Sequence, residues 1–153
     1  MGKILVIDDE EGIRGFLKRG FEIDGHDVMT AADGAEGLEI VTQQQGAFDL
    51  VVSDIRMPMM DGIAFSLAAK RDFPNLLILL MTGYAEQRER CSSLQHIIVD
   101  VMSKPFNLME MREKVKSILI QSTFSAPEHN ENQPNTHIDE TAVDTHKRLY
   151  PTQ

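Results

Sequence analysis

The stretch ILVIDDE, residues 4–10, decides the fold of this chain and raises its main chemical question. Four apolar residues, Ile4–Ile7, form a run of strand length, and such unbroken runs are typical of parallel strands buried on both faces. The run ends in two adjacent carboxylates, Asp8 and Asp9. Crowded carboxylates repel each other and raise each other's pKa. A bound cation would relieve this repulsion, so a metal site is expected where the strand ends.

Apolar runs of similar length recur along the first 121 residues. They lie at Leu50–Val52, Leu76–Met81 and Ile97–Met102, with a weaker strand at Asp27–Ala31. The segments between these runs space their apolar residues as helices do. Examples of residues that share one helical face are Ile63 with Leu67, and Leu108 with Met111, Val115 and Ile118. The alternation predicts an α/β fold, a doubly wound five-stranded parallel sheet.

The overall composition excludes several classes of protein. A chain of 153 residues with 42% apolar residues suits one domain with one core. The net charge of −9 argues against a protein that grips nucleic acid with basic side chains, so no direct DNA binding is expected. Cys91 is the only cysteine, which excludes an internal disulfide. The N-terminal apolar run is too short for a signal peptide or a membrane span, so we expect a cytoplasmic protein with no membrane partner.

The composition changes near Gln121. Residues 122–153 hold three of the six prolines, three of the five histidines and few large apolar residues. Such a segment buries too little surface to offset the entropy of ordering it. We therefore expect a domain over residues 1–121 and a disordered tail over residues 122–153, which is too short for a winged-helix DNA-binding domain.

Polar side chains follow four of the five predicted strands. They are Asp8 and Asp9, Asp54, Thr82, and Lys104. Ligands of open α/β sheets bind beyond the carboxyl ends of the strands, so these groups should meet there. Three carboxylates can hold Mg²⁺ through oxygen ligands. A hydroxyl and an ammonium group can bind phosphate oxygens, as phosphoryl transfer requires, and a carboxylate in such a site can be the nucleophile.

Four motifs in this order carry a resemblance to a known family. VIDDE, SDIRMPMMDG, MTGYA and SKPF, at residues 6–10, 53–62, 81–85 and 103–106, resemble those of the response regulator receiver domain. The resemblance covers residues 1–121. It implies the flavodoxin-like (βα)5 fold of CheY-like proteins.

The resemblance also implies a role for each site residue. Asp54 is then the phosphoryl acceptor. The cofactor is Mg²⁺, ligated directly by Asp9, Asp54 and the backbone carbonyl of Arg56, and through water by Asp8. Thr82 is the switch hydroxyl and Lys104 pairs with the phosphoryl group. The Lys104–Pro105 peptide bond is expected to be cis, because an X–Pro bond prefers trans by only about 0.5–1 kcal/mol.

One position departs from the family pattern. The family usually has an aromatic switch residue three positions before the lysine of the fifth strand, and here that residue is Val101. Tyr84, two residues after Thr82, is a candidate substitute. The bulk of the Tyr84 side chain can also set the lifetime of an acyl phosphate. Arg56, two residues after Asp54, is the other position that can set it.

The resemblance implies partners and a class of function. It indicates a stand-alone receiver that takes its phosphoryl group from a sensor histidine kinase or a histidine phosphotransfer protein. An unknown output protein would bind residues 84–94, the fifth strand and residues 107–120. The alternative is a phosphate sink or relay without an output of its own. The chain also resembles alphaproteobacterial single-domain regulators of CpdR type, and neither its cognate kinase nor its oligomeric state follows from the sequence.

The chain is not expected to be an enzyme beyond slow self-dephosphorylation. Phosphatases on similar sheets typically need a second aspartate two residues after the nucleophile, and Arg56 occupies that position here.

Simpler roles compete for several of these residues. Asp8 and Asp9 suit the start of the first helix, where acidic side chains stabilise the terminus. Asp54 suits a turn before a Met–Pro pair. Asp61 with the following glycine is better explained as a turn and helix cap than as a metal ligand, and Cys91 as an incidental thiol. Only the combination of acids, hydroxyl and lysine at neighbouring strand ends favours a site.

Overall fold

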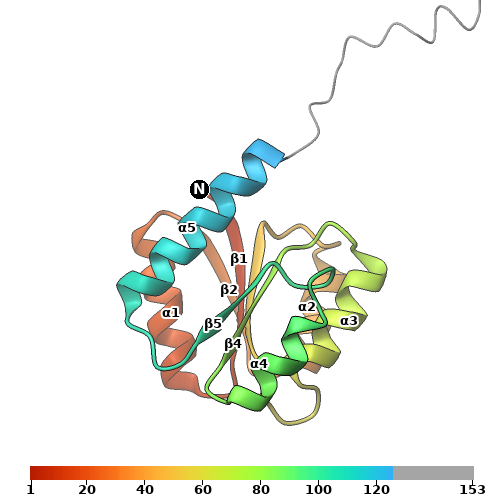
Figure 1. The fold of residues 1–153 in the computed structure, drawn as a ribbon. Coiled ribbons are helices and arrows are strands. Elements are labelled where there is room, and N and C mark those ends of the chain that lie inside the picture. The colour runs from red at the N-terminus through yellow and green to blue at the C-terminus, as the bar shows by residue number, and fades with distance from the viewer. Residues whose placement is uncertain (126–153) are drawn as a thin grey trace, which may run out of the picture.

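One parallel sheet forms the centre of the protein (Figure 1). The computed structural model describes residues 1–125, except for the side chains of residues 85–87 and 125. The strand order is β2-β1-β3-β4-β5. The strands are β1 (Lys3–Ile7), β2 (Asp27–Ala31), β3 (Leu50–Asp54), β4 (Ile78–Thr82) and β5 (Asp100–Ser103).

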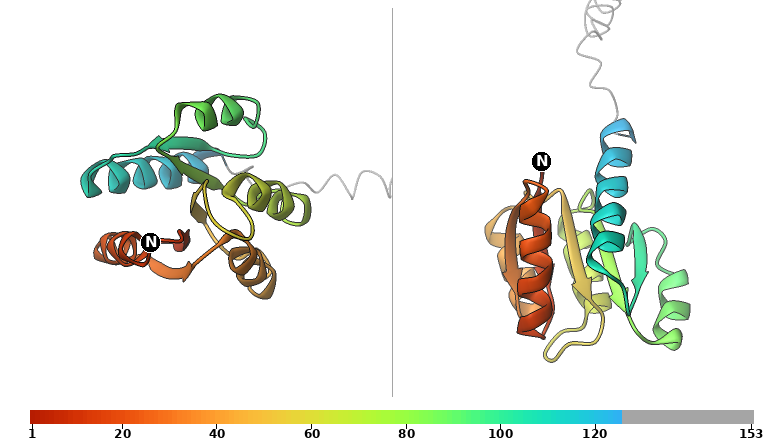
Figure 2. Two further views of the ribbon diagram at one scale, coloured as in Figure 1. Left: turned by 90° about the horizontal axis from the view of Figure 1, so that it is seen from below. Right: turned by 90° about the vertical axis from the view of Figure 1, so that its left-hand side faces the viewer.

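Helices cover both faces of the sheet. They are α1 (Glu11–Ile23), α2 (Gly34–Gln43), α3 (Gly62–Asp72), α4 (Ala85–Ser92) and α5 (Leu108–Ser125). In Figures 1 and 2, α1 and α5 lie on one face, and α2, α3 and α4 lie on the other. The doubly wound five-stranded fold predicted from the alternating pattern is confirmed.

The core consists of two layers of apolar side chains, one on each face of the sheet. Alternate residues of β1 enter different layers, with Ile4 and Val6 on the α1 and α5 side and Leu5 and Ile7 on the other. All residues of β3 and β4 are buried. Because both faces are covered, these strands read as continuous apolar runs, and they provide a rigid base for whatever follows their carboxyl ends.

Two strands begin later than their apolar runs. β4 begins at Ile78, and β5 begins at Asp100. Ile97 lies in the turn that follows α4, and Ile98 packs into the core from outside any strand. An apolar run therefore marks burial, and burial extends here into the connection that leads to the strand.

The last helix is longer than expected. α5 runs to Ser125, so the predicted boundary at Gln121 falls within it. Leu119 still packs against the core, and the next helix-breaking residue in the sequence is Pro127. The remainder of the predicted tail, residues 126–153, lies outside the described residues. Among the described helices, none is long and apolar enough to cross a membrane.

Candidate functional site

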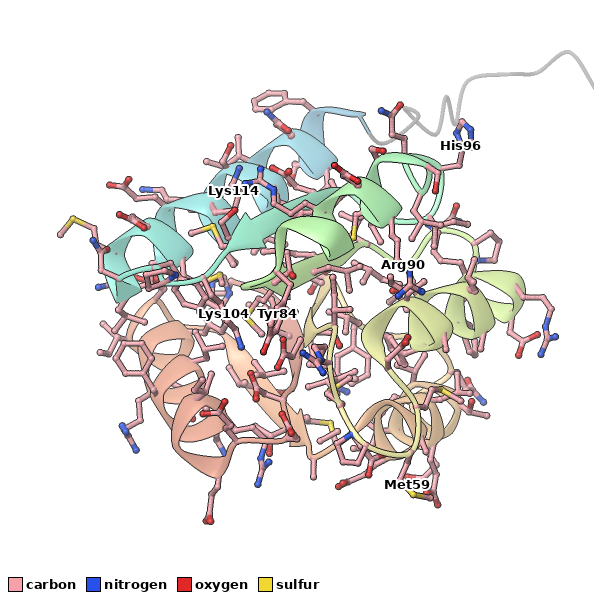
Figure 3. All side chains as sticks on the ribbon, turned by 60° about the horizontal axis from the view of Figure 1, so that its bottom comes forward. Met59, Tyr84, Arg90, His96, Lys104 and Lys114 are labelled. Carbon is pink, nitrogen blue, oxygen red and sulfur yellow. The ribbon has the colours of Figure 1, made fainter. Side chains whose placement is uncertain are left out.

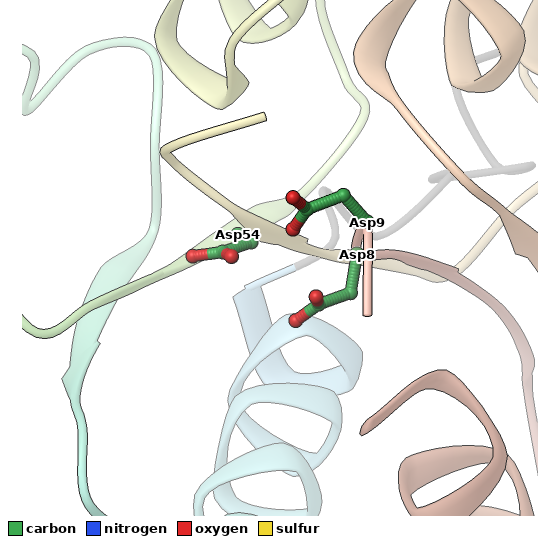
Figure 4. A group of neighbouring side chains, drawn as sticks. All are labelled: Asp8, Asp9 and Asp54. Carbon is green, nitrogen blue, oxygen red and sulfur yellow. The ribbon is translucent and has the colours of Figure 1, made fainter. Parts of the chain in front are cut away.

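Three aspartates gather at the carboxyl end of the sheet (Figure 4). Asp8 and Asp9 follow β1, and Asp54 is the last residue of β3. These strands are neighbours, with Ile7 paired to Ser53, so the three side chains emerge together. One carboxylate oxygen from each aspartate lies within 4.8 Å of the other two.

Two of these carboxylates are buried and only partly hydrogen-bonded. Asp8 is inaccessible to solvent and Asp54 is 8% exposed. Oδ1 of Asp8 accepts a hydrogen bond from the backbone N–H of Glu10 at 2.9 Å, and Oδ1 of Asp54 accepts one from Ile55 at 2.9 Å. Oδ2 of Asp8 accepts no hydrogen bond from the described residues. A buried, unsatisfied oxygen is costly, and such atoms often point to an absent ligand.

Neither aspartate of the pair caps the first helix. The N-cap residue of α1 is Glu10, and no side-chain hydrogen bond from the residues that the structure describes caps that helix. The simple capping interpretation of Asp8 and Asp9 is therefore wrong. Asp61 does cap a helix, because its side chain accepts a hydrogen bond from the N–H of Ala64 at the start of α3.

Lys104 brings a positive charge to the acidic cluster. Its Nζ lies 3.3 Å from Oδ2 of Asp54 and 3.5 Å from Oδ2 of Asp8. The second distance is that of an ion pair and too long for a good hydrogen bond, so it leaves the Asp8 oxygen unsatisfied. The Lys104–Pro105 peptide bond, expected to be cis, is cis. Figure 3 shows Lys104 at the same end of the molecule as Tyr84.

The electrostatics of the cluster favour a bound cation. Burial, aided by the charge of Asp54, raises the pKa of Asp8 to about 6. Burial also raises the pKa of Asp54, although Lys104 opposes that shift. Burial works against the charge of Lys104, but the two carboxylates outweigh it and raise the pKa of its ammonium group. The positive charge of Lys104 thus offsets only part of the negative charge of the three aspartates.

The donor set fits a hard dication. Three carboxylates within 4.8 Å of one another, one of them with an unsatisfied buried oxygen, are oxygen ligands of the kind that Mg²⁺ prefers. Asp9 is exposed, which leaves one side of the cluster open to water and to a phosphorylated ligand. The site therefore suits an ion with few protein ligands and several waters.

The end of β4 places a hydroxyl close to a tyrosine. Thr82, the last residue of β4, is 2% exposed. Its Oγ1 accepts a hydrogen bond from the N–H of Tyr84 at 3.1 Å and donates one to the Tyr84 carbonyl at 3.3 Å. The ring of Tyr84 lies against Arg56, whose guanidinium carbon is 4.6 Å from the ring centroid.

Val101, at the position where the resemblance leads us to expect an aromatic switch residue, lines a hollow. It is half-buried on β5 and packs against the core on the α4 side. A hollow of about 180 Å³ between α4 and β5 is lined by Val101, Cys91 and Ile98, among others. The thiol of Cys91 is buried there, and burial raises its pKa.

Close packing of α3 against β3 also shapes the site. Gly62 begins α3, and a Cβ added there would clash with the backbone carbonyl of Asp54. Glycine is therefore required at this position by the close approach of two backbone segments. The connection from β3 to α3 carries Arg56, which lines a hollow together with Asp9.

Two neighbouring hollows contain residues that the motifs do not indicate. One, of about 440 Å³, is mainly apolar and lies between α1 and the segment after β5; it is lined by Ile13, Phe16, Lys104, Pro105 and Phe106. The other, of about 510 Å³, is lined by Asp9, Arg56, Met57, Pro58, Asp61 and Arg90. Figure 3 shows Arg90 on α4. From the sequence, Phe16 has the spacing of a core residue on α1, but in the structure it is 40% exposed and lines the apolar hollow.

Comparison with known proteins places the chain in one family. The model of the response regulator receiver domain matches residues 4–116. The transcriptional regulatory protein PhoP of alkaline phosphatase synthesis, from Bacillus subtilis, is 37% identical over 82% of this chain and 51% of its own length. Sporulation initiation phosphotransferase F, also from Bacillus subtilis, is 35% identical over 76% of this chain and 93% of its own length.

A solved structure agrees with these matches. The response regulator protein TrrA from Thermotoga maritima, in complex with Mg²⁺ and BeF, is 35% identical, with a TM-score of 0.68 over 77% of this chain and 99% of that one. The chain spans about half the length of the transcriptional regulators that it matches. From the family model, these relatives and the fold, we conclude that the chain belongs to the response regulator receiver domain family.

Proposed function

We propose that Asp54 accepts a phosphoryl group in a Mg²⁺-dependent reaction and that the protein thereby controls a partner. The observation that carries this proposal is the convergence of Asp8, Asp9 and Asp54 within 4.8 Å, with Lys104 3.3 Å from the Asp54 carboxylate. The family of two-component receivers and the Mg²⁺ complex of the relative TrrA support it.

The proposed metal ligands are Asp9, Asp54 and the carbonyl of Arg56, with Asp8 bound through water. Bound Mg²⁺ would supply the positive charge that allows these carboxylates and a phosphoryl group to share one site. The unsatisfied Oδ2 of Asp8 supports this assignment, because a metal-bound water would donate to it.

The chemical step assigns a task to each remaining residue. An Asp54 oxygen attacks the donor phosphorus while the bond from phosphorus to the donor breaks, and the donor leaves with the bonding electron pair. A phosphohistidine donor leaves as an imidazole, which takes a proton from solvent if it departs as the anion. Lys104 and Thr82 then bind phosphoryl oxygens, which positions the group and balances its charge. The product is an aspartyl phosphate.

The described chain offers a surface for each proposed partner. A histidine kinase or histidine phosphotransfer protein can approach over the apolar hollow beside Lys104, where Phe16 is exposed. An output protein would bind α4, β5 and α5, the elements that follow Thr82 and Lys104 in the chain. Some relatives are transcriptional regulators, so the expected absence of direct DNA binding by this chain stays a prediction.

The domain limits belong to the same proposal. Residues 1–121 would form the phosphoryl-accepting domain and residues 122–153, the first of which end α5, a segment that the chemistry does not need. The family match, which ends at residue 116, supports this division.

The proposal is tested by intact mass after incubation with acetyl phosphate, with and without Mg²⁺. One phosphoryl adduct is expected, only with Mg²⁺, and Asp54→Ala and Asp54→Asn should both lack it. Asp72→Ala, which removes an exposed carboxylate at the end of α3, is the matched control and should be phosphorylated normally. A Mg²⁺-dependent adduct that persists in both Asp54 variants would contradict the assignment of the acceptor.

A relay function is a second candidate, and one observation favours it. The relative named a phosphotransferase matches over 93% of its length, whereas the transcriptional regulators match over about half. A relay would pass the phosphoryl group from Asp54 to the histidine of a phosphotransfer protein. Loss of the adduct from purified phosphorylated protein, with its gain by such an acceptor, would favour the relay over a receiver that holds its phosphate.

A further inference from the structure

The hydroxyl of Thr82 is held by the backbone of Tyr84. It accepts a hydrogen bond from the Tyr84 N–H at 3.1 Å and donates its hydrogen to the Tyr84 carbonyl at 3.3 Å. A threonine hydroxyl has a single hydrogen to donate. The hydroxyl therefore has to give up the Tyr84 carbonyl if it is to donate to a phosphoryl oxygen on Asp54. Tyr84 is also the N-cap residue of α4, so this change occurs at the start of that helix.

The position of Tyr84 is supported from a different segment. Its side chain is 53% exposed and belongs to neither apolar core layer. Its ring lies against the guanidinium of Arg56, whose central carbon is 4.6 Å from the ring centroid. Arg56 follows β3 and Tyr84 follows β4, and these strands are paired with Asp54 opposite Met81. The contact thus joins the segment after the acceptor to the segment after the switch hydroxyl.

We infer that Arg56 and Tyr84 form a latch that holds the Thr82 hydroxyl in its resting arrangement and that must open when the site takes up a phosphoryl group. This inference rests on the proposed function and adds a regulatory element to it. A contact that is stronger in the resting state than in the phosphorylated state shifts the equilibrium toward rest. Weakening the latch should therefore tighten the binding of a phosphoryl mimic, although it removes a contact.

The size of the effect follows from the kind of contact. An exposed cation–π pair has a strength that corresponds to about a two- to fivefold change in an equilibrium constant. Tyr84→Leu removes the aromatic face without changing charge, so the variant keeps the electrostatic field of the site. Tyr84→Phe retains the ring and is the conservative variant. Arg56→Lys keeps the charge and loses the planar guanidinium that stacks on aromatic rings.

The first measurement is the affinity for beryllium fluoride at saturating Mg²⁺. We expect Tyr84→Leu to bind it about two- to fivefold more tightly than wild type, and Tyr84→Phe to bind it as wild type does. Arg56→Lys should be tighter than wild type, and in the double variant Arg56→Lys/Tyr84→Leu the two effects should not add. Lys3→Gln, which removes a second cation–π contact of the described residues, 5.1 Å from the Phe48 ring and at the amino end of the sheet, should change nothing.

The second measurement needs no phosphoryl mimic. Hydrogen exchange of the residue-84 amide reports directly on its bond to the Thr82 hydroxyl, and we expect faster exchange in Tyr84→Leu than in wild type or Tyr84→Phe. Unchanged exchange, or equal or weaker binding of beryllium fluoride by Tyr84→Leu, would overturn the latch. If wild type binds no beryllium fluoride, the proposed function fails, and the exchange rates alone then decide whether the latch exists.

Discussion

The two ends of the central sheet use the same kinds of residue to opposite effect. At the carboxyl end, Asp8, Asp9 and Asp54 crowd together, and burial raises the pKa of Asp8 and of Asp54. At the amino end, acidic side chains are separated and paired. Asp24 accepts a hydrogen bond from Nε of Arg112 at 2.9 Å, which lowers the pKa of its carboxyl.

Two further contacts at the amino end follow the same pattern. Oδ2 of Asp49 accepts the backbone N–H of Lys3 at 2.7 Å, and Nδ1 of His26 accepts the N–H of Gly2 at 2.9 Å. A hollow of about 420 Å³ lies among these residues. Asp24, His26 and Asp49 line it, and the side chain of each has a hydrogen-bond partner. The amino end is thus satisfied by its own residues, whereas the carboxyl end has an acidic oxygen left without a hydrogen bond. Local violations of this kind are expected at functional sites.

The largest effect should come from relieving the strain at the carboxyl end. Asp8→Asn removes a buried negative charge that faces two other carboxylates, so we expect the free energy of unfolding in Mg²⁺-free buffer to rise by about 1–3 kcal/mol. In saturating Mg²⁺, wild type should gain stability by binding the ion and the variant should gain less. Urea unfolding under both conditions measures this, with Asp72→Asn, which alters an exposed carboxylate at the end of α3, as the control for charge alone. If Asp8→Asn is less stable than wild type without Mg²⁺, the carboxylates at the carboxyl end do not destabilise the protein, and the proposed difference between the two ends is wrong.

A smaller effect of opposite sign is expected at the amino end. The pKa of Asp24 is lowered, so its contribution to stability is present above the ordinary value of 3.8 and is lost as the pH falls through the lowered folded-state pKa. Asp24→Asn should therefore be less stable than wild type at neutral pH, and the two should converge in acid. Unfolding by urea across this pH range checks the prediction. Asp72→Asn, which alters an exposed carboxylate 3.8 Å from its sequence neighbour Arg71, should show no such pattern.

The smallest effect concerns His26. Burial lowers the pKa of its imidazole below the ordinary 6.5, and the neutral ring is the form that accepts the Gly2 N–H. The unfolded chain then binds its proton at a higher pH than the folded one, so the free energy of unfolding should decrease as the pH falls from about 6.5 toward the folded-state value. His26→Gln should flatten this part of the pH profile. The exposed His96→Gln serves as the comparison, and an unchanged profile in His26→Gln would assign the pH dependence to other groups.

Much of the architecture was predictable because the sheet is parallel and buried on both faces. β2 has the bounds expected for it, Asp27–Ala31. Asp8 and Thr82 stand directly after an apolar run, and Asp54 and Lys104 stand two residues beyond one, so the end of each run located a side chain at the carboxyl end. The predictions were wrong where a buried residue lies outside a strand, or where a residue on an expected buried face is exposed. Ile98 is buried outside a strand, and Leu67, expected to share a face of α3 with Ile63, is 48% exposed.

The sequence by itself determined the order of elements and that the three aspartates and Lys104 meet, because strand periodicity and parallel pairing place the carboxyl ends together. Only the tertiary structure decided which oxygen of Asp8 is left unsatisfied, that Asp8 and Asp9 do not cap α1, and that Arg56 lies against Tyr84. These features depend on how segments far apart in the chain approach one another across the sheet. Local patterns record which face of an element is buried, and they carry no information on the distance between side chains of different connections.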